Sequence, residues 1–265
     1  MKRAKEGDKK EILEFLNNKL ADCLYMYIDI KKYGLTSANM DIWIERDNEK
    51  IHTVIMRYYD SLQMISDNNN WNKEWIKNLI IKEEFTTISG RADMIKELLP
   101  LLDRLYNVSF GTVFQLLEYR KADDSSMVTY AQKEDLEEIA KLICIDEVFK
   151  SSYQISSLEK QLKDRMDNGM GRNVIIKSDG KIISHIATYA ELDDISITSG
   201  MITHPEYRDS SYSFLVESFL TNELLKEGKR VFTLVLDGKR VTYLRALKGK
   251  ECGKYGRLTL NVSNN

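Results

Sequence analysis

The clearest pattern along the chain lies between residues 195 and 227. From Ile195 to Thr203 the side chains follow a period of two, which predicts a strand. A short polar segment follows, and apolar residues then recur at helical spacing, which predicts a helix from Tyr212 to Glu227 that stops before Gly228. A strand that turns tightly into an amphipathic helix directs backbone N–H groups and the positive end of the helix dipole toward one point. This geometry suits an anion.

Around this segment the second half of the chain alternates between strand and helix patterns. A hairpin signal at 178–180 joins two of the strands, and a capping-box pattern at Ser156 and Glu159 opens one of the helices. The predicted strands are Met127–Ala131, Asn173–Lys177, Lys181–Glu191, Arg230–Leu236 and Gly253–Leu260, and the predicted helices are Lys133–Cys144, one containing Leu158, Leu162 and Met166, and Val241–Leu247.

The first half has a similar rhythm and a less regular pattern. Asp8 and Glu11 start a predicted helix, and two strands flank a turn at 47–48. The predicted strands are Tyr25–Ile30, Met40–Ile44, Ile51–Tyr59, Leu62–Ile65, Phe85–Ser89 and Val108–Tyr119, with helices through Trp71–Ile80 and after Gly90. This alternation predicts an α/β unit. In this half only Ser89–Arg91 resembles a remnant of a phosphate loop. A structural or substrate-gating role is therefore favoured for the first half of the chain.

The polar segment Lys121–Ser126 is the best candidate for a domain boundary. It predicts two domains, residues 1–120 and residues 127–265, of which the first is the smaller α/β domain. A length of 265 residues accommodates two domains of ordinary size.

Composition narrows the function classes. The net charge of −2 gives no reason to expect a nucleic-acid partner. Three cysteines without CxxC spacing favour a reducing compartment, and the three histidines show no metal-ligand spacing. The charged amino terminus lacks the apolar region of a secretion signal, and no apolar run reaches membrane-spanning length. We therefore expect a cytoplasmic protein without metal or membrane; the sequence leaves a monomer and a homodimer open.

The run from Gly200 to Ser213, Gly-Met-Ile-Thr-His-Pro-Glu-Tyr-Arg-Asp-Ser-Ser-Tyr-Ser, resembles the core of the GNAT superfamily of acetyl-coenzyme A dependent N-acetyltransferases. The resemblance covers residues from about Met127 to the carboxyl terminus well and the first half only loosely, as a degenerate half of the same kind. It implies an α/β (α+β) fold with a mixed central sheet flanked by helices, whose central strands splay to admit a cofactor.

The resemblance also implies which residues bind acetyl-CoA, the co-substrate. Backbone groups of Met201, Ile202 and Thr203 would hold the pantetheine arm. The pyrophosphate loop would comprise Arg208, Asp209, Ser210, Ser211, Tyr212 and Ser213, and Asp237 stands near an expected asparagine. Ser211 and Ser213 occupy positions where the family has glycines. Glycine permits positive φ and a close approach of the backbone, so the loop is either a modified binding loop or a scaffold that has lost the coenzyme.

Two catalytic residues are expected on the same basis. Tyr243 lies where the family has the tyrosine that protonates the leaving thiolate, although the usual Leu-Gly-Phe sequel is absent. Glu191 ends a strand near the presumed substrate side and is the candidate base. The structural alternatives are a core tyrosine for Tyr243 and a solvated turn acid for Glu191. His185, in the middle of the same strand, is interpreted as structural.

These features predict an N-acetyltransferase that moves an acetyl or other acyl group from its coenzyme A thioester to an amine of a small molecule or a protein. The identity of the acceptor is not encoded in any motif. The alternative is a catalytically inactive binding or regulatory protein on the same scaffold, motivated by Ser211 and Ser213. A transferase using aminoacyl-tRNA is a third reading, and the lack of a basic excess argues against it.

Overall fold

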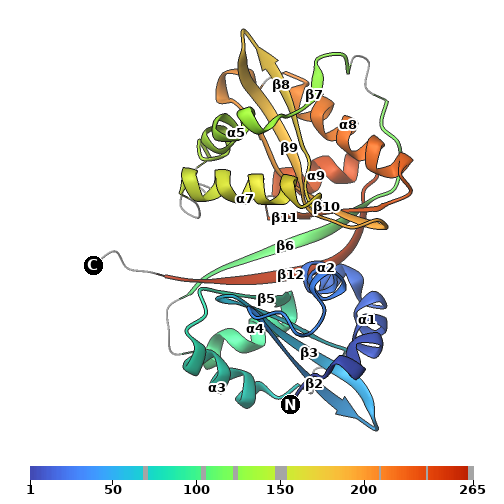
Figure 1. Ribbon diagram of the computed structural model, residues 1–265, viewed down its shortest axis with the longest axis vertical. Coiled ribbons are helices and arrows are strands. Elements are labelled where there is room, and N and C mark those ends of the chain that lie inside the picture. The colour runs from blue at the N-terminus through green and yellow to red at the C-terminus, as the bar shows by residue number, and fades with distance from the viewer. Residues whose placement is uncertain are drawn as a thin grey trace. The chain divides into compact units, whose positions relative to one another are not determined.

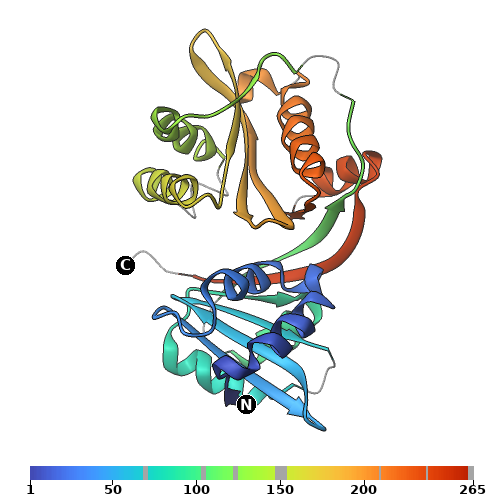
Figure 2. The same ribbon diagram turned by 45° about the vertical axis from the view of Figure 1, so that its right-hand side comes forward.

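The structure, a computed structural model, describes residues 1–67, 71–102, 106–121, 125–146, 154–208, 210–236 and 238–261. The chain divides into two compact units (Figures 1 and 2). Unit 1 comprises Met1–Phe114, Val235–Tyr243 and Glu251–Asn265, and unit 2 comprises Gln115–Leu234 and Leu244–Lys250. Each unit contains a sheet with helices on both faces (Figure 1).

Unit 1 is built on strands that follow one another in space in the order β1-β2-β3-β4-β5-β12-β6. The pairs β1–β2, β2–β3 and β3–β4 are antiparallel, and the pair β4–β5 is parallel. Strand β12 lies antiparallel to β5. The strands are β1 (Lys2–Arg3), β2 (Met40–Asp47), β3 (Lys50–Tyr58), β4 (Ser61–Ser66), β5 (Thr87–Arg91), β6 (Tyr106–Leu116) and β12 (Lys250–Leu260). The helices are α1 (Lys9–Asn17), α2 (Leu24–Tyr33), α3 (Lys73–Glu83) and α4 (Ala92–Leu98).

The apolar periodicity of α3 and α4 explains how this sheet is covered. Ile76, Ile80, Ile95 and Leu98 are buried against sheet residues in one cluster that also contains Phe85. Helices α1 and α2 lie on the other face (Figure 2). The predicted helix after Trp71 and the predicted strands of residues 40–65 are confirmed.

Unit 2 has the strand order β7-β8-β9-β10-β11. Its strands are β7 (Val128–Tyr130), β8 (Asn173–Ser178), β9 (Lys181–Glu191), β10 (Ile195–Thr203) and β11 (Arg230–Val235), and only β10–β11 among these pairs is parallel. The helices α5 (Leu136–Ile143) and α7 (Ile155–Asp167) cover one face, and α8 (Tyr212–Lys226) covers the other (Figure 1). Helix α9 (Gly238–Ala246) has residues in both units.

The two halves of the chain repeat one order of elements. The series β1, α1, α2, β2, β3, β4, α3, β5, α4, β6 corresponds step by step to β7, α5, α7, β8, β9, β10, α8, β11, α9, β12. The parallel pair falls at the same place in both series. Residues 67–72, between β4 and α3, are therefore the counterpart of residues 204–211. Ser89–Arg91, considered above as a loop remnant, lies inside β5.

Two elements differ from the sequence-based prediction. Residues 25–30 belong to helix α2 and form no strand. Most side chains of this segment are buried, namely Met26, Tyr27, Ile28 and Ile30, as is the preceding Leu24. A short apolar run of this kind is the same in a strand and in a buried helix, so the sequence alone does not distinguish the two. Helix α7 starts at Ile155 after Gln154, so Ser156 lies inside it and does not cap it.

The final strand joins the sheet of unit 1. Tyr255 to Thr259 of β12 pair with Arg91 to Thr87 of β5. The sequence predicted a boundary at 121–126 with all later residues in one domain. The division into compact units differs, because Val235–Tyr243 and Glu251–Asn265 belong to unit 1. A hydrophobic period shows that a strand exists, but it does not show which strand will be its neighbour. In the described part of the chain, no helix combines the length and the apolar character needed to cross a membrane.

Candidate functional site

The central strand of unit 2 contains a bulge at Gly200. The β9–β10 register passes from Ser199 opposite Ala187 to Ile202 opposite His185, so two residues of β10 face one residue of β9. Gly200 has a φ of 65°, a left-handed conformation that residues with a Cβ adopt only at a cost. A bulge of this kind bends the strand and changes the direction of the groups that follow it.

His185 holds the bulge from β9. Its ring is fully buried, and Nδ1 lies 2.8 Å from the carbonyl oxygen of Gly200. Burial lowers the pKa of His185 to about 4, although the bond to Gly200 acts in the opposite direction, so the ring is neutral at pH 7. Since a carbonyl only accepts, Nδ1 carries the proton and donates it to Gly200.

The second nitrogen of His185 faces a buried amide. Nε2 lies 3.0 Å from Oδ1 of Asn173, at the start of β8. In the neutral ring Nε2 is an acceptor, so the amide completes this bond when it is turned over to present its nitrogen. Sequence reasoning interpreted His185 as structural and did not identify Asn173. The one available signal for the bulge was a glycine inside an otherwise regular strand.

The pairing of β10 with its parallel neighbour β11 ends just before the bulge. The described β10–β11 register runs from Ile195 opposite Arg230 to Thr198 opposite Thr233. Strand β10 continues for a further five residues to Thr203. Met201, Ile202 and Thr203 therefore lie in the part of β10 that follows the end of this pairing, where backbone groups can bind an extended ligand as a strand would.

The loop after β10 is compact. Pro205–Tyr207 form a single 3₁₀ turn that starts at His204, and Arg208 follows it. Nε of Arg208 donates to the carbonyl oxygen of Thr203 at 3.3 Å, which fixes the stem of an otherwise exposed side chain. The guanidinium at the end of this strand is suited to a phosphate group.

The serines of the loop adopt ordinary backbone conformations. Ser211 is the N-cap residue of α8 with φ −81° and ψ 5°, and among the described loop residues none has a positive φ. Ser210 Oγ donates to the carbonyl oxygen of Tyr207 and accepts from the N–H of Tyr212 at 3.4 Å. The path of the backbone therefore does not require glycine at position 211 or 213. Asp209 and Asp237 lie outside the described residues.

The start of α8 is the anion-directed part of this segment. N–H groups in the first turn of a helix have no partner within the helix, and the dipole places partial positive charge there. Ser213 lies in that turn. Arg208, Ser210, Ser211 and Tyr212 are thus brought together with Met201–Thr203 along one continuous stretch of unit 2.

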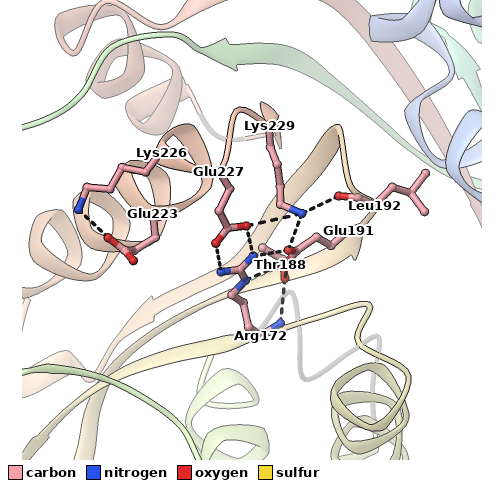
Figure 3. A network of polar contacts seen from close by, with 8 residues as sticks. All are labelled: Arg172, Thr188, Glu191, Leu192, Glu223, Lys226, Glu227 and Lys229. Atoms are coloured by element: carbon pink, nitrogen blue, oxygen red, sulfur yellow. Dashed lines mark hydrogen bonds and ion pairs between the residues drawn. The ribbon is translucent and has the colours of Figure 1, made fainter.

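Glu191 lies in a different part of unit 2, in a network of charged side chains (Figure 3). It is buried and paired with Arg172 and with Nζ of Lys229 at 3.1 Å, and it accepts a hydrogen bond from Thr188 Oγ1 at 2.9 Å. Arg172 also binds Glu227, the residue after α8, at 2.7 Å. The network joins the end of β9 to the end of α8.

Two observations argue against a role for Glu191 as a base. Burial alone would raise its pKa, but the bonds from Arg172, Thr188 and Lys229 prevail and lower it, so the carboxylate is a weak proton acceptor. Glu191 is also opposite Ser196. Met201 lies five positions beyond Ser196 in β10, which is about 16 Å along the strand.

Tyr243 lies on helix α9, which the sequence predicted as a helix over Val241–Leu247. Its hydroxyl is buried, and the guanidinium of Arg240 lies 4.7 Å from the centre of its ring. Among the described residues, no group of three or more His, Cys, Asp or Glu side chains could hold a metal ion.

Comparison with known proteins gives a result at the level of the fold. No family model matches the chain, and no curated protein matches it. A Drosophila protein of known structure superposes with a TM-score of 0.69 at 10% identity, over 98% of this chain and 97% of that one. A tandem GNAT protein from the clavulanic acid biosynthesis pathway superposes with a TM-score of 0.57 at 11% identity, over 100% of this chain and 98% of that one.

A third structure is similar over the same span. An acetyltransferase from the GNAT family of Colwellia psychrerythraea has a TM-score of 0.56 at 11% identity and covers 98% of this chain and 99% of its own. The identities are too low to carry an activity, so they show the fold alone. Together with the repeated order of elements in the two halves, they establish that the chain has the GNAT acetyltransferase fold along its whole length.

Proposed function

We propose that unit 2 binds acetyl-CoA or a related thioester and that the protein transfers the acyl group to an amine. The observation that carries this proposal is the bulged end of β10 followed by the loop and the start of α8. It combines an extended backbone edge, an arginine and a helix amino terminus in chain order, which matches a ligand with a pantetheine arm and a pyrophosphate. The GNAT proteins with the same fold support it.

In this proposal, backbone groups of Met201–Thr203 hold the pantetheine arm beside β10. Arg208 and the N–H groups from Ser211 to Ser213 bind the pyrophosphate. The serine hydroxyls are additional donors, and the negative φ at Ser211 shows how the loop accommodates a Cβ. Asp209 and Asp237 remain predicted contributors.

The reaction itself is mainly one of positioning. The amine nitrogen attacks the thioester carbonyl, the new C–N bond forms, and the C–S bond breaks. The nitrogen loses a proton to water or a base, and the departing thiolate gains one. Tyr243 is the proposed donor of that proton. Glu191 is excluded from the proposed catalytic groups by its ion pairs and its position, and its proposed role is to fix the end of β9 on α8.

Unit 1 has a different proposed role. In the counterpart of the loop, Asp67 directly follows β4, and its N–H donates to the carbonyl oxygen of His52. Asn72 caps α3 through a bond from the N–H of Trp75 at 3.0 Å. An acidic residue and an occupied helix cap disfavour a pyrophosphate. We therefore propose that one molecule of acetyl-CoA binds per chain, at the site in unit 2.

The test is a calorimetric titration of the protein with acetyl-CoA. We expect saturable binding of one equivalent, and a loss of affinity of about 10- to 100-fold for Arg208→Glu, since a charge-assisted bond to phosphate is lost. Arg257→Glu, an exposed arginine of β12 in unit 1, is the matched control and should not change the affinity. Equal affinities for the two variants would contradict the assignment of the loop.

The alternative is an inactive binding protein on the same scaffold. It shares the binding prediction and differs in turnover. Release of free coenzyme A thiol in the presence of amines, followed with a thiol reagent, supports the transferase. Tight acetyl-CoA binding without turnover of any amine, in wild type and at all pH values between 6 and 9, would support the alternative.

A further inference from the structure

Arg165 of α7 lies close to the bulge and has no role in the proposed coenzyme site. Its guanidinium carbon is 4.3 Å from the centre of the Tyr189 ring. The same ring contacts the bulge, because a Cβ built on Gly200 would lie 2.8 Å from Tyr189 Oη. The Tyr189 ring therefore contacts both the guanidinium and the point where β10 bends.

The backbone of β9 explains this placement. Ile197 is opposite Ala190 and Thr198 is opposite Thr188, so Tyr189 has no counterpart on β10 and forms a second bulge. The side chain of Tyr189 packs with the cluster under α5 and α7. Gly171 lets the stem of Arg165 approach, since a Cβ there would lie 3.0 Å from Arg165 Cβ.

The guanidinium of Arg165 is incompletely satisfied. Nη2 donates to Gln161 Oε1 at 3.4 Å, a long bond, while Nη1 is buried and has no hydrogen-bond partner in the part of the chain that the structure describes. Arginines 120, 172 and 230 of unit 2 each pair with a carboxylate. Among the described residues no carboxylate pairs with Arg165. A buried donor that lacks an acceptor is rare and calls for an explanation, and an anion bound there is one that also uses the positive charge of the guanidinium.

We propose that Arg165 binds an anionic group, a carboxylate or a phosphate, on the acyl acceptor, so that the substrate is an amino acid or another amine that carries an acid. This inference rests on the proposed transferase function and specifies its substrate class. The planar guanidinium presents two parallel N–H groups to a carboxylate or phosphate. The Tyr189 ring holds that plane in place by a cation–π contact.

The reaction keeps its balance with such an acceptor. Its ammonium loses one proton to water, the amine attacks the thioester carbonyl, and the C–N bond forms as the C–S bond breaks. The nitrogen then loses its second proton to water, and the leaving thiolate gains a proton from Tyr243, the proposed donor. The acid of the acceptor takes no part in bond making. Its contact with Arg165 positions the amine and therefore affects kcat/KM for acids more than for neutral amines.

The experiment compares amines that differ only in the acid. Glycine is compared with glycinamide, each standard amino acid with its amide, and phosphoethanolamine with ethanolamine, using acetyl-CoA as donor and thiol release as the readout. The variants are Arg165→Met, which keeps the packing of the stem, and Arg165→Lys, which keeps the charge. Lys163→Gln, on the exposed side of the same helix, is the matched control. Acetyl-CoA titration of every variant is measured in parallel.

We expect wild type to favour at least one acid over its neutral partner by about 10- to 100-fold in kcat/KM. Arg165→Met should remove this preference by lowering kcat/KM for the acid toward that for its neutral partner. Arg165→Lys should restore part of the preference, and Lys163→Gln should keep all of it. The amino acid and phosphoethanolamine arms distinguish a carboxylate from a phosphate.

Saturable acetyl-CoA binding without higher turnover of any acid than of its neutral partner would overturn the role of Arg165. An unchanged preference in Arg165→Met would overturn it as well. Failure of wild type to bind acetyl-CoA would instead overturn the proposed function, so the two failures are distinguishable.

Discussion

The bulge at Gly200 allows a quantitative prediction for Gly200→Ala. An alanine at a φ of 65° costs about 1–2 kcal/mol in the folded state. Its Cβ would also lie 2.8 Å from Oη and 3.1 Å from Cε1 of Tyr189. The guanidinium of Arg165 also packs against that ring, and overpacking of this kind costs about 1–3 kcal/mol. The free energy of unfolding should therefore fall by about 2–5 kcal/mol.

Gly180→Ala is the matched control for this prediction. Gly180 lies in the β8–β9 hairpin turn with a φ of 77°, and a Cβ there would have no atom within 4 Å. This variant carries the backbone cost alone, about 1–2 kcal/mol. Urea unfolding gives the free energy of unfolding of wild type and of both variants. The loss for Gly200→Ala should exceed the loss for Gly180→Ala by about 1–3 kcal/mol, which is the cost of crowding at the bulge.

A second substitution tests the cause. Tyr189→Leu removes the atoms that the new Cβ would meet, so Gly200→Ala in that background should cost no more than Gly180→Ala does. Gly200→Ala should also weaken acetyl-CoA binding, because it moves the edge of β10. Equal destabilisation by Gly200→Ala and Gly180→Ala would refute the reasoning, as would a Gly200→Ala cost that does not depend on Tyr189.

Other predictions concern the remaining charged and polar groups. Glu191→Gln should lower stability at pH 7, because the native pKa of Glu191 is lowered and its contribution is therefore present above the unfolded pKa. That contribution is lost as the pH falls through the native pKa, so the acid unfolding curves of wild type and variant should converge once the pH is below it. Arg120→Met should cost about 3 kcal/mol in urea unfolding, because it leaves the carboxylate of Glu217 buried without Arg120, its ion-pair partner at 2.8 Å. Tyr243→Phe should lower kcat about 100-fold without changing acetyl-CoA affinity, and an unchanged kcat would exclude it as the acid.

The local pattern predicted the strand and the helix of the candidate site well. The alternation from Ile195 to Thr203 coincides with β10, and the helical period that follows coincides with α8 to within one residue. Both signals are local. Side chains of a strand alternate between the two faces of the sheet, and a helix that packs on one face has an apolar residue every three to four positions, so each element has its own period in the sequence. The short apolar run at 25–30 carried no such period and was assigned wrongly.

The features that shape the site depend on contacts between distant residues. The bulge at Gly200 is held by His185, and the pairing of β12 with β5 joins residues more than 160 positions apart, from Arg91 with Tyr255 to Thr87 with Thr259. The ion pairs of Glu191 join residues 19 and more positions apart in sequence, so the pattern around Glu191 alone shows an acid at a strand end. Tertiary packing determines such partners, and no periodicity encodes them.

Amide hydrogen exchange with and without saturating acetyl-CoA tests the central claim most directly, because it locates the coenzyme on the chain. We predict increased protection at residues 199–203 and 210–215, and no change at residues 64–67 and 71–76, the counterparts in unit 1. Protection of the unit 1 segment instead, or no change at β10 and the start of α8 while acetyl-CoA is bound, would contradict the assignment of the coenzyme site to unit 2.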